Sequence, residues 1–197
     1  MSLKERVYSV LVVSASESFN NSLSELLPEA KYSPIYFVSS LSAAKRTFAE
    51  RIIDYVIINS PLPDDNGTRF AIDICETKSS VVLLMVRAEL HDEIYDKVAE
   101  HGVFTLSKPF SKSMMVNALS WMSSARERLR SMEKKTLTLN EKMEEIRTVN
   151  RAKWLLISEL KMGEPEAHRF VEKQAMDRCV TKRQVAEEII KTYSCRC

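Results

Sequence analysis

Short apolar runs alternate with amphipathic stretches along the first 110 residues of the chain. Five apolar runs have the length of a single strand, at residues 7–13, 35–38, 55–58, 81–86 and 103–106. Between them, apolar residues recur at helical spacing over residues 18–27, 42–51, 68–78 and 92–101. Strands that are apolar throughout are buried on both faces, and strands that alternate with helices pair in parallel. The pattern therefore predicts an α/β fold, a doubly wound five-stranded parallel sheet with helices on either side.

A heptad repeat follows this domain. One seam position holds Met115, Met122, Leu129, Thr136, Met143 and Asn150, and the other holds Ala118, Ala125, Met132, Leu139 and Ile146. The repeat extends over about five heptads without glycine or proline. It predicts a long coiled-coil helix and therefore a homodimer through residues 115–150. The alternative is a single amphipathic helix that folds back on its own domain.

The apolar positions of residues 147–197 form three short helical stripes. These are Ala152, Leu155, Leu156, Ile157 and Leu160; Ala167, Phe170, Val171 and Ala175, with Gln174 at the same helical spacing; and Val185, Ala186, Ile189 and Ile190. Met176, next to Ala175, is also expected in the core. Gly163 is expected to close the first helix in the left-handed conformation, and Glu164-Pro165 to begin the second. Thr181 and Gln184 have the spacing of a capping box for the third. The tail is thus predicted to be a small three-helix C-terminal domain with a thin core.

The composition, 45% hydrophobic and 28% charged over 197 residues, is typical of a soluble protein with one full domain and a smaller one. No apolar run reaches membrane-spanning length and no signal peptide is recognised, so a cytoplasmic location is expected. The net charge is +2, but residues 147–197 hold eleven Lys and Arg against seven Asp and Glu. A basic excess of this size is compatible with nucleic acid binding and also with solvated helix faces.

The four cysteines are Cys75, Cys179, Cys195 and Cys197. Their spacing fits neither a disulfide framework nor a usual zinc site. Reduced thiols are the favoured interpretation, and a redox or metal pair at Cys195 and Cys197 is the alternative.

The tail contains a set of short motifs at a defined spacing: Ala152-Lys153, Leu155-Leu156, Glu166-Ala167, Gln174-Ala175-Met176-Asp177 and Val185-Ala186. This pattern resembles the ANTAR domain, an RNA-binding module of bacterial transcription antiterminators. Trp154 stands where the family usually has glycine, and His168 where an aromatic residue is usual. The resemblance implies that a dimer of such units binds stem-loops in nascent leader RNA and favours readthrough of a terminator.

Basic and amide side chains in or beside these motifs are the candidate RNA-binding residues: Arg151, Lys153, Lys173, Gln174, Arg178 and Lys182. Arg147 and Lys191, at the two edges of the unit, are weaker candidates. Each of these charges alone is more often a solvated surface group. Trp154 either stacks on a base or packs in the small core, and packing is the interpretation that we favour.

The first domain resembles the response-regulator receiver domain, through residues 59–67 and Lys108-Pro109-Phe110. In that family an acid after the third strand accepts a phosphoryl group, and two acids after the first strand hold Mg²⁺. Here those positions are Asn59, Ser14 and Ala15. The hydroxyl residue of the fourth strand aligns with Arg87, and Lys108 alone is retained, so the chain has a degenerate phosphorylation site. Magnesium prefers charged oxygen ligands, so neither a metal nor a cofactor is predicted.

Two interpretations of Lys108 stay open. In the first, Lys108-Pro109 forms a turn, with a cis bond as in the family, that supports the fold. In the second, Lys108 and Arg87 are charges that attract an anion or a carboxylate. Asp64 and Asp65 are interpreted as a polar turn before Gly67 rather than as substitute phosphate acceptors.

The sequence thus predicts a receiver-like domain at residues 1–110, a coiled-coil connector helix at 111–146 and an ANTAR-like domain at 147–197. The expected function is that of a dimeric, non-enzymatic regulator that binds structured RNA and is not phosphorylated, with a regulatory protein or a small ligand acting on the receiver-like domain. One alternative is a protein-interaction regulator without RNA binding, and another is a phosphorylated two-component response regulator.

Overall fold

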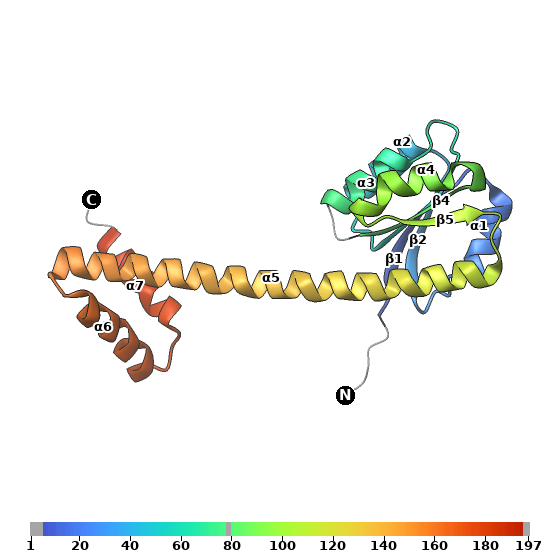
Figure 1. Cartoon of the computed structure of the whole chain (residues 1–197). Coiled ribbons are helices and arrows are strands. Elements are labelled where there is room, and N and C mark those ends of the chain that lie inside the picture. The colour runs from blue at the N-terminus through green and yellow to red at the C-terminus, as the bar shows by residue number, and fades with distance from the viewer. Residues whose placement is uncertain (1–5, 78–79, 195–197) are drawn as a thin grey trace. The chain divides into compact units, whose positions relative to one another are not determined.

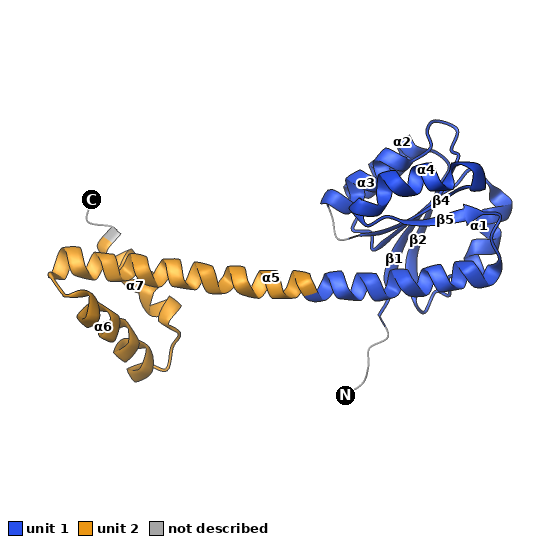
Figure 2. Ribbon diagram, viewed as in Figure 1, with its two compact units in different colours: residues 1–131 blue, residues 132–197 orange. Residues whose placement is uncertain are grey.

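The computed structural model describes residues 6–77 and 80–194, which belong to two compact units, Met1–Ser131 and Met132–Cys197 (Figure 2). The first unit contains a sheet with helices around it, and the second is helical (Figure 1). The interpretation of Cys195 and Cys197 lies outside the described residues. Within these residues, no helix combines the length and the apolar character needed to span a bilayer.

The sheet of the first unit is parallel throughout, with the strand order β2-β1-β3-β4-β5. The strands are β1 (Tyr8–Val13), β2 (Tyr32–Val38), β3 (Tyr55–Asn59), β4 (Val81–Arg87) and β5 (Phe104–Lys108). The predicted doubly wound, five-stranded parallel sheet is therefore confirmed. The order reverses between β1 and β3, and the carboxyl ends of these strands are where ligands bind in such sheets.

Helices cover both faces of the sheet (Figure 1). The first face is covered by α2 (Leu41–Glu50), α3 (Thr68–Thr77) and α4 (Ala88–Val98), the second by α1 (Glu17–Ser24) and the start of α5 (Lys112–Leu160). A 3₁₀ turn, Ala99–His101, follows α4 and ends at Gly102. Helix α1 is shorter than predicted, because a proline such as Pro28 disfavours helical geometry in the residue before it.

Helix α5 is continuous over 49 residues and joins two elements that the sequence pattern separated. Met115, Ala118 and Met122 are buried against the sheet, and Leu129 packs partly against the same cluster. The predicted coiled coil is thus wrong over residues 115–129, where the helix folds back on its own domain. The reason is that α1 alone is too short to cover this face of apolar strands. The first of the three expected short helices is also not separate, because it is the end of α5.

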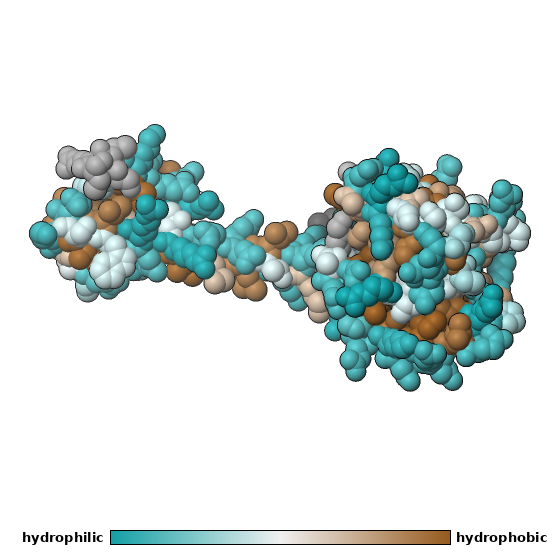
Figure 3. Space-filling view, turned by 90° about the horizontal axis from the view of Figure 1, so that it is seen from above, coloured by the Kyte–Doolittle hydropathy of each residue, from teal (hydrophilic) through white to brown (hydrophobic). Residues whose placement is uncertain are grey.

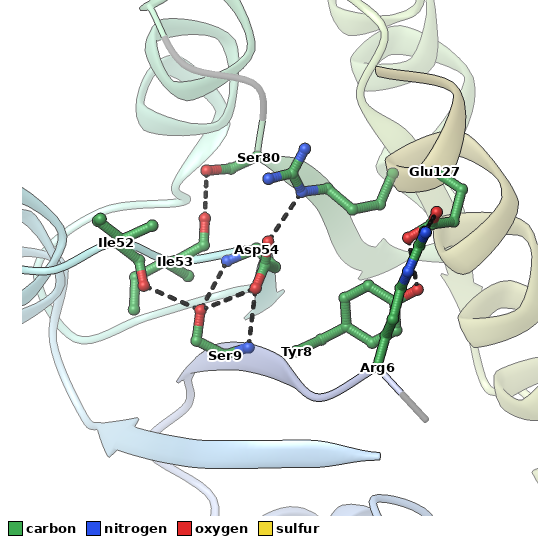
Figure 4. A network of polar contacts seen from close by, with 9 residues as sticks. Arg6, Tyr8, Ser9, Ile52, Ile53, Asp54, Ser80 and Glu127 are labelled. Carbon is green, nitrogen blue, oxygen red and sulfur yellow. Dashed lines mark hydrogen bonds and ion pairs between the residues drawn. The ribbon is translucent and has the colours of Figure 1, made fainter. Parts of the chain in front are cut away.

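A polar network fixes α5 at the amino ends of β1 and β3 (Figure 4). Arg126 Nε donates to Asp54 Oδ1 at 2.9 Å, and the two side chains are only 12% and 18% exposed. Asp54 Oδ2 also accepts the backbone N–H of Ser9 at 3.0 Å. On the next residue of α5, Glu127 Oε1 accepts the hydroxyl of Tyr8 at 2.9 Å. The point at which α5 extends past the sheet is therefore defined by charge as well as by packing.

In the second unit, the end of α5 packs against α6 (Glu164–Asp177) and α7 (Lys182–Ser194). Its core is small and rich in alanine: Ala152, Leu156, Ala167, Val171, Ala175, Val185, Ala186 and Ile189. The capping box is confirmed, because Gln184 Oε1 accepts from Thr181 N at 3.0 Å and Thr181 Oγ1 accepts from Gln184 N at 3.2 Å. The three helices thus share one thin core, as predicted.

The junction between α5 and α6 differs from the prediction. Lys161, with a φ of 56°, takes the left-handed conformation after α5. Gly163 is instead extended, with a φ of −73° and a ψ of 155°, and is the N-cap of α6. An N-cap residue has extended backbone angles, so Gly163 cannot close one helix and also begin the next.

Trp154 and Met176 were expected in the core and are instead 70% and 78% exposed. Trp154 is two residues from the buried Ala152, which corresponds to a rotation of about 200° around a helix. Met176 is five residues from the buried Val171, a rotation of about 140°. Both side chains therefore point away from the core of their own unit.

Two glycines with the same backbone conformation allow a matched test of packing. Gly67 and Gly102 both have a φ of 78°, but a Cβ on Gly67 would lie 2.8 Å from Ile58 Cγ2, whereas Gly102 has no atom within 4 Å of that position. Gly102→Ala should lower the free energy of unfolding by about 1–2 kcal/mol, the cost of a left-handed alanine. Gly67→Ala should lower it by about 3 kcal/mol, because overpacking is added. Urea denaturation measures both, and equal losses would contradict a tight contact with Ile58.

Candidate nucleic-acid interface and receiver cavity

The predicted residues of the degenerate phosphorylation site meet at the carboxyl edge of the sheet. Asn59 ends β3, and its Nδ2 donates to Ser14 Oγ at 2.9 Å. The same hydroxyl oxygen accepts the backbone N–H of Ser16 at 3.2 Å, and Ser14 is buried. As predicted, Ser14 and Asn59 place two neutral groups, joined by a hydrogen bond, at this edge of the sheet.

Two cations lie beside this pair. Arg87 and Lys108 are register partners on β4 and β5, and Lys108 Nζ donates to the carbonyl oxygen of Ser60. Burial, and secondly the charge of Arg87, lower the pKa of Lys108 below its usual value. Among the described residues, no carboxylate forms an ion pair with either cation. The Lys108–Pro109 bond is cis, as expected.

The two aspartates of the following loop have structural partners. Asp64 accepts the backbone N–H groups of Leu41 and Ser42, at 2.9 and 3.0 Å, in the first turn of α2. These bonds hold the pKa of its carboxyl group below the usual range. Asp65 Oδ1 accepts from Gly67 N at 2.8 Å, within the turn. Neither carboxylate is therefore a replacement for the acid missing at Asn59.

This edge does not fit a magnesium ion. Mg²⁺ requires oxygen ligands, usually with one or two carboxylates, and Ser14, Ala15 and Asn59 supply no negative charge. No group of three His, Cys, Asp or Glu side chains suited to a metal occurs in residues 6–77 and 80–194. An amide also cannot form an acyl phosphate. The side chains of the predicted site are therefore neutral or basic.

In the second unit, three of the six candidate RNA-binding side chains are held by carboxylates. Lys153 Nζ lies 3.0 Å from Glu164 Oε1, and its side chain is only 14% exposed. Arg178 forms two bonds to Glu188, at 2.6 and 2.7 Å, and Lys182 Nζ lies 2.6 Å from Glu172 Oε1. These pairs join α5 to α6 and α6 to α7. In each pair the cation lowers the pKa of the carboxyl group.

The other three candidate RNA-binding side chains differ in their exposure to solvent. Arg151 and Lys173 are exposed, and neither has an ion-pair partner in the part of the chain that the structure describes. Gln174 is half-buried and lines a cavity of about 230 Å³ together with Arg178. Arg151 and Lys153 are two residues apart and so lie on different sides of α5. The six residues therefore do not form one continuous surface.

A different group of exposed side chains lies on one side of α5. Arg147, Arg151 and Trp154 follow each other at spacings of four and three residues, which places them in one row. Arg147 Nη1 is 2.6 Å from Glu144 Oε1, and Arg151 is one turn nearer the end of the helix. On α6, Arg169 lies one turn before Lys173 and is exposed too. Helical spacing is the sequence signal that identifies Trp154 and Arg169, which were missing from the six.

Comparison with known proteins agrees with both halves of the structure. Residues 137–190 match the ANTAR domain family. The chain is similar to the transcriptional regulatory protein PdtaR of Mycobacterium tuberculosis (strain CDC 1551 / Oshkosh), with 27% identity over 184 residues, which cover 93% of this chain and 89% of that protein.

Solved structures of receiver domains resemble the first unit. A signal receiver domain of an HD domain-containing protein from Pseudomonas fluorescens Pf-5 has a TM-score of 0.55 and 23% identity, and covers 68% of this chain and 96% of its own. The beryllofluoride-activated NtrC4 receiver domain dimer has a TM-score of 0.52 and 27% identity, and covers 61% of this chain and 98% of its own. The chain thus has the organisation of an ANTAR response regulator, a receiver-fold unit followed by an ANTAR domain.

Proposed function

We propose that this protein is a non-enzymatic regulator that binds structured RNA through its ANTAR domain, acts as a homodimer in transcription antitermination, and is not phosphorylated on its receiver-fold unit. The match of residues 137–190 to the ANTAR family is the observation on which the RNA-binding role rests. Similarity to a transcriptional regulatory protein over nearly the whole chain supports the same role. The neutral pair of Asn59 and Ser14 supports the absence of phosphorylation.

The row of Arg147, Arg151 and Trp154 on α5 is the surface that best fits RNA. Loops of RNA are recognised through bases that stack on aromatic side chains, while cations contact the phosphates. Exposed Trp154 lies one turn from Arg151, which has no ion-pair partner among the residues that the structure describes, so the row offers both kinds of contact. Lys173, on α6, adds a second exposed cation.

The homodimer is proposed from the second half of the heptad repeat. Met132, Leu139, Met143 and Ile146 are each about half exposed or more on a helix that has no partner at these positions within the described chain. They occupy the seam positions of the repeat, with spacings of seven, four and three residues. Covering them with the same stripe of a second chain removes this apolar surface from water. The proposed contact therefore extends over residues 132–150, beyond the part of α5 that is buried on the sheet.

RNA binding is tested by fluorescence anisotropy with a labelled tandem stem-loop RNA at several salt concentrations. Trp154→Ala should weaken binding about 10- to 100-fold, as expected for the loss of one stacked base. Arg151→Ala and Lys173→Ala should each weaken binding and lower the slope of log K against log salt by about one. Lys45→Ala, which removes an exposed lysine from α2 of the receiver-fold unit, is the matched control and should have no effect.

The ion-paired candidates need a paired comparison. If Lys153 contacts RNA, Lys153→Ala weakens RNA binding while Glu164→Gln does not. If the Lys153–Glu164 ion pair only stabilises the packing of α5 against α6, both variants lose the same RNA affinity.

The absence of phosphorylation is tested separately. Prior incubation of the protein with acetyl phosphate should add no phosphoryl mass and leave the RNA affinity unchanged. Weak, equal binding of every RNA by all variants would reject RNA recognition and favour the protein-interaction alternative.

A further inference from the structure

A cavity lies at the carboxyl edge of the receiver-fold sheet, and its residues take no part in the proposed RNA binding. Its volume is about 480 Å³, and its lining consists of Ala15, Ser16, Phe19, Asn59, Pro61, Lys108 and Phe110. One wall is thus polar and basic, with the amide of Asn59 and the ammonium group of Lys108. The other wall is apolar and includes two aromatic rings.

The charged side chains closest to this cavity are basic. Lys108 lines it, and Arg87 lies beside Lys108 across the β4–β5 pairing. The nearby acids have other positions or partners: Asp64 caps α2, and Glu17 is exposed in the first turn of α1. Within residues 6–77 and 80–194 neither cation is paired with a carboxylate, and two such neighbouring cations attract an anion, most strongly one with two charges.

A second cavity lies on the other side of residues that line the apolar wall of the first. It has a volume of about 280 Å³ and shares Phe19 and Phe110 with the first cavity. Leu23 and Leu26 of α1 and Met115 of α5 provide its apolar surface, while Lys112 and Glu25, 3.6 Å apart, also line it. A molecule that extends from Lys108 past the two phenylalanines would therefore pass from a basic to an apolar environment.

We infer that the two cavities together form a binding site for a small organic oxyanion, with its acid group at Lys108 and Asn59 and a short apolar body between α1 and α5. Ligand sites in proteins are usually concave and largely apolar, with a few polar groups that fix the orientation, and this site has that form. A phosphate monoester is attracted more strongly than a carboxylate by Lys108, which lines the cavity, and by Arg87 beside it, because it carries more charge. The occupant also contacts Phe110 and Met115, next to and within the first turns of the helix that continues into the ANTAR domain.

Isothermal titration calorimetry of the full chain with hexyl phosphate tests this site. We expect one molecule bound per chain, with inorganic phosphate and hexanol each at least about tenfold weaker, because each lacks one half of the ligand. Hexanoate should bind between these limits. Failure of both hexyl phosphate and hexanoate to bind, or equal affinity for hexanol, would overturn the inference.

Two variants at one exposed position locate the site without disturbing the core. Ala15→Asp places a negative charge in the cavity and should weaken hexyl phosphate binding by about tenfold. Ala15→Asn introduces a side chain of nearly the same size as aspartate but without the charge, and should leave the affinity for hexyl phosphate unchanged. Lys108→Gln should weaken it further, with its thermal unfolding recorded to check the fold. Unchanged affinity in Ala15→Asp would place the bound molecule elsewhere and reject this site. None of these measurements depends on RNA.

Discussion

Replacing Asp54 with alanine is expected to lower the free energy of unfolding of the receiver-fold unit by about 3 kcal/mol. The carboxylate is bonded to Arg126 Nε at 2.9 Å and to Ser9 N at 3.0 Å, with both charged side chains largely buried. Its removal leaves a buried guanidinium group without its counter-charge and a backbone N–H without its acceptor. The decrease in local stability should be largest in the part of α5 that leaves the sheet.

Urea denaturation gives the overall change, and hydrogen exchange of the amides of residues 115–129 locates it. Asp54→Asn keeps the shape and an acceptor for Ser9 and should lose less than Asp54→Ala. Glu93→Ala breaks an exposed pair with Lys97, 2.6 Å apart, and is the matched control without a measurable effect. If Asp54→Ala behaved like Glu93→Ala, the network would not fix α5.

The parts of the structure that the sequence predicted are those with a distinctive local pattern. Strands such as β3 and β4 are apolar at nearly every position, which only a sheet covered on both faces requires. Asn59 could be placed at the carboxyl edge because it directly ends such a strand, whereas Lys108, at the end of the mixed strand β5, was placed by the resemblance of Lys108-Pro109-Phe110 to the receiver family. The capping box of Thr181 and Gln184 is local in the same way.

The features that the sequence could not predict depend on the tertiary contacts of each side chain. Met115 and Met143 occupy the same heptad position, yet the first is buried on the sheet and the second is exposed. A heptad pattern states that one face of a helix is apolar and does not identify what covers it. The ion pairs of Arg178 with Glu188 and of Lys182 with Glu172 join different helices, so they follow from packing rather than from spacing.

The position of Trp154 could have been predicted. A helix rotates by about 200° over two residues, so Ala152 and Trp154 cannot both face one core. The buried Ala152 and Leu156 already define that core. An exposed tryptophan then requires another explanation, and stacking on RNA is the one that we propose.

Leu139→Glu should convert the proposed homodimer to a monomer at micromolar concentration. The variant removes one seam leucine from each chain and places two like charges in the contact, a loss of about 3–5 kcal/mol that corresponds to at least a 100-fold weaker association. Sedimentation equilibrium of the full chain measures this change. RNA affinity should fall with it, because two ANTAR domains would no longer bind tandem stem-loops together.

Leu137→Glu is the matched control for this prediction. Leu137 and Leu139 are 62% and 61% exposed in the single chain, but only Leu139 occupies a seam position. Leu137→Glu changes the composition and the charge of the chain as Leu139→Glu does, but its side chain points about 200° away around the helix. A dimer that is retained in Leu137→Glu and lost in Leu139→Glu would identify the heptad seam as the contact. Equal behaviour of the two variants would exclude a coiled coil here and leave the exposed stripe of α5 for a different partner.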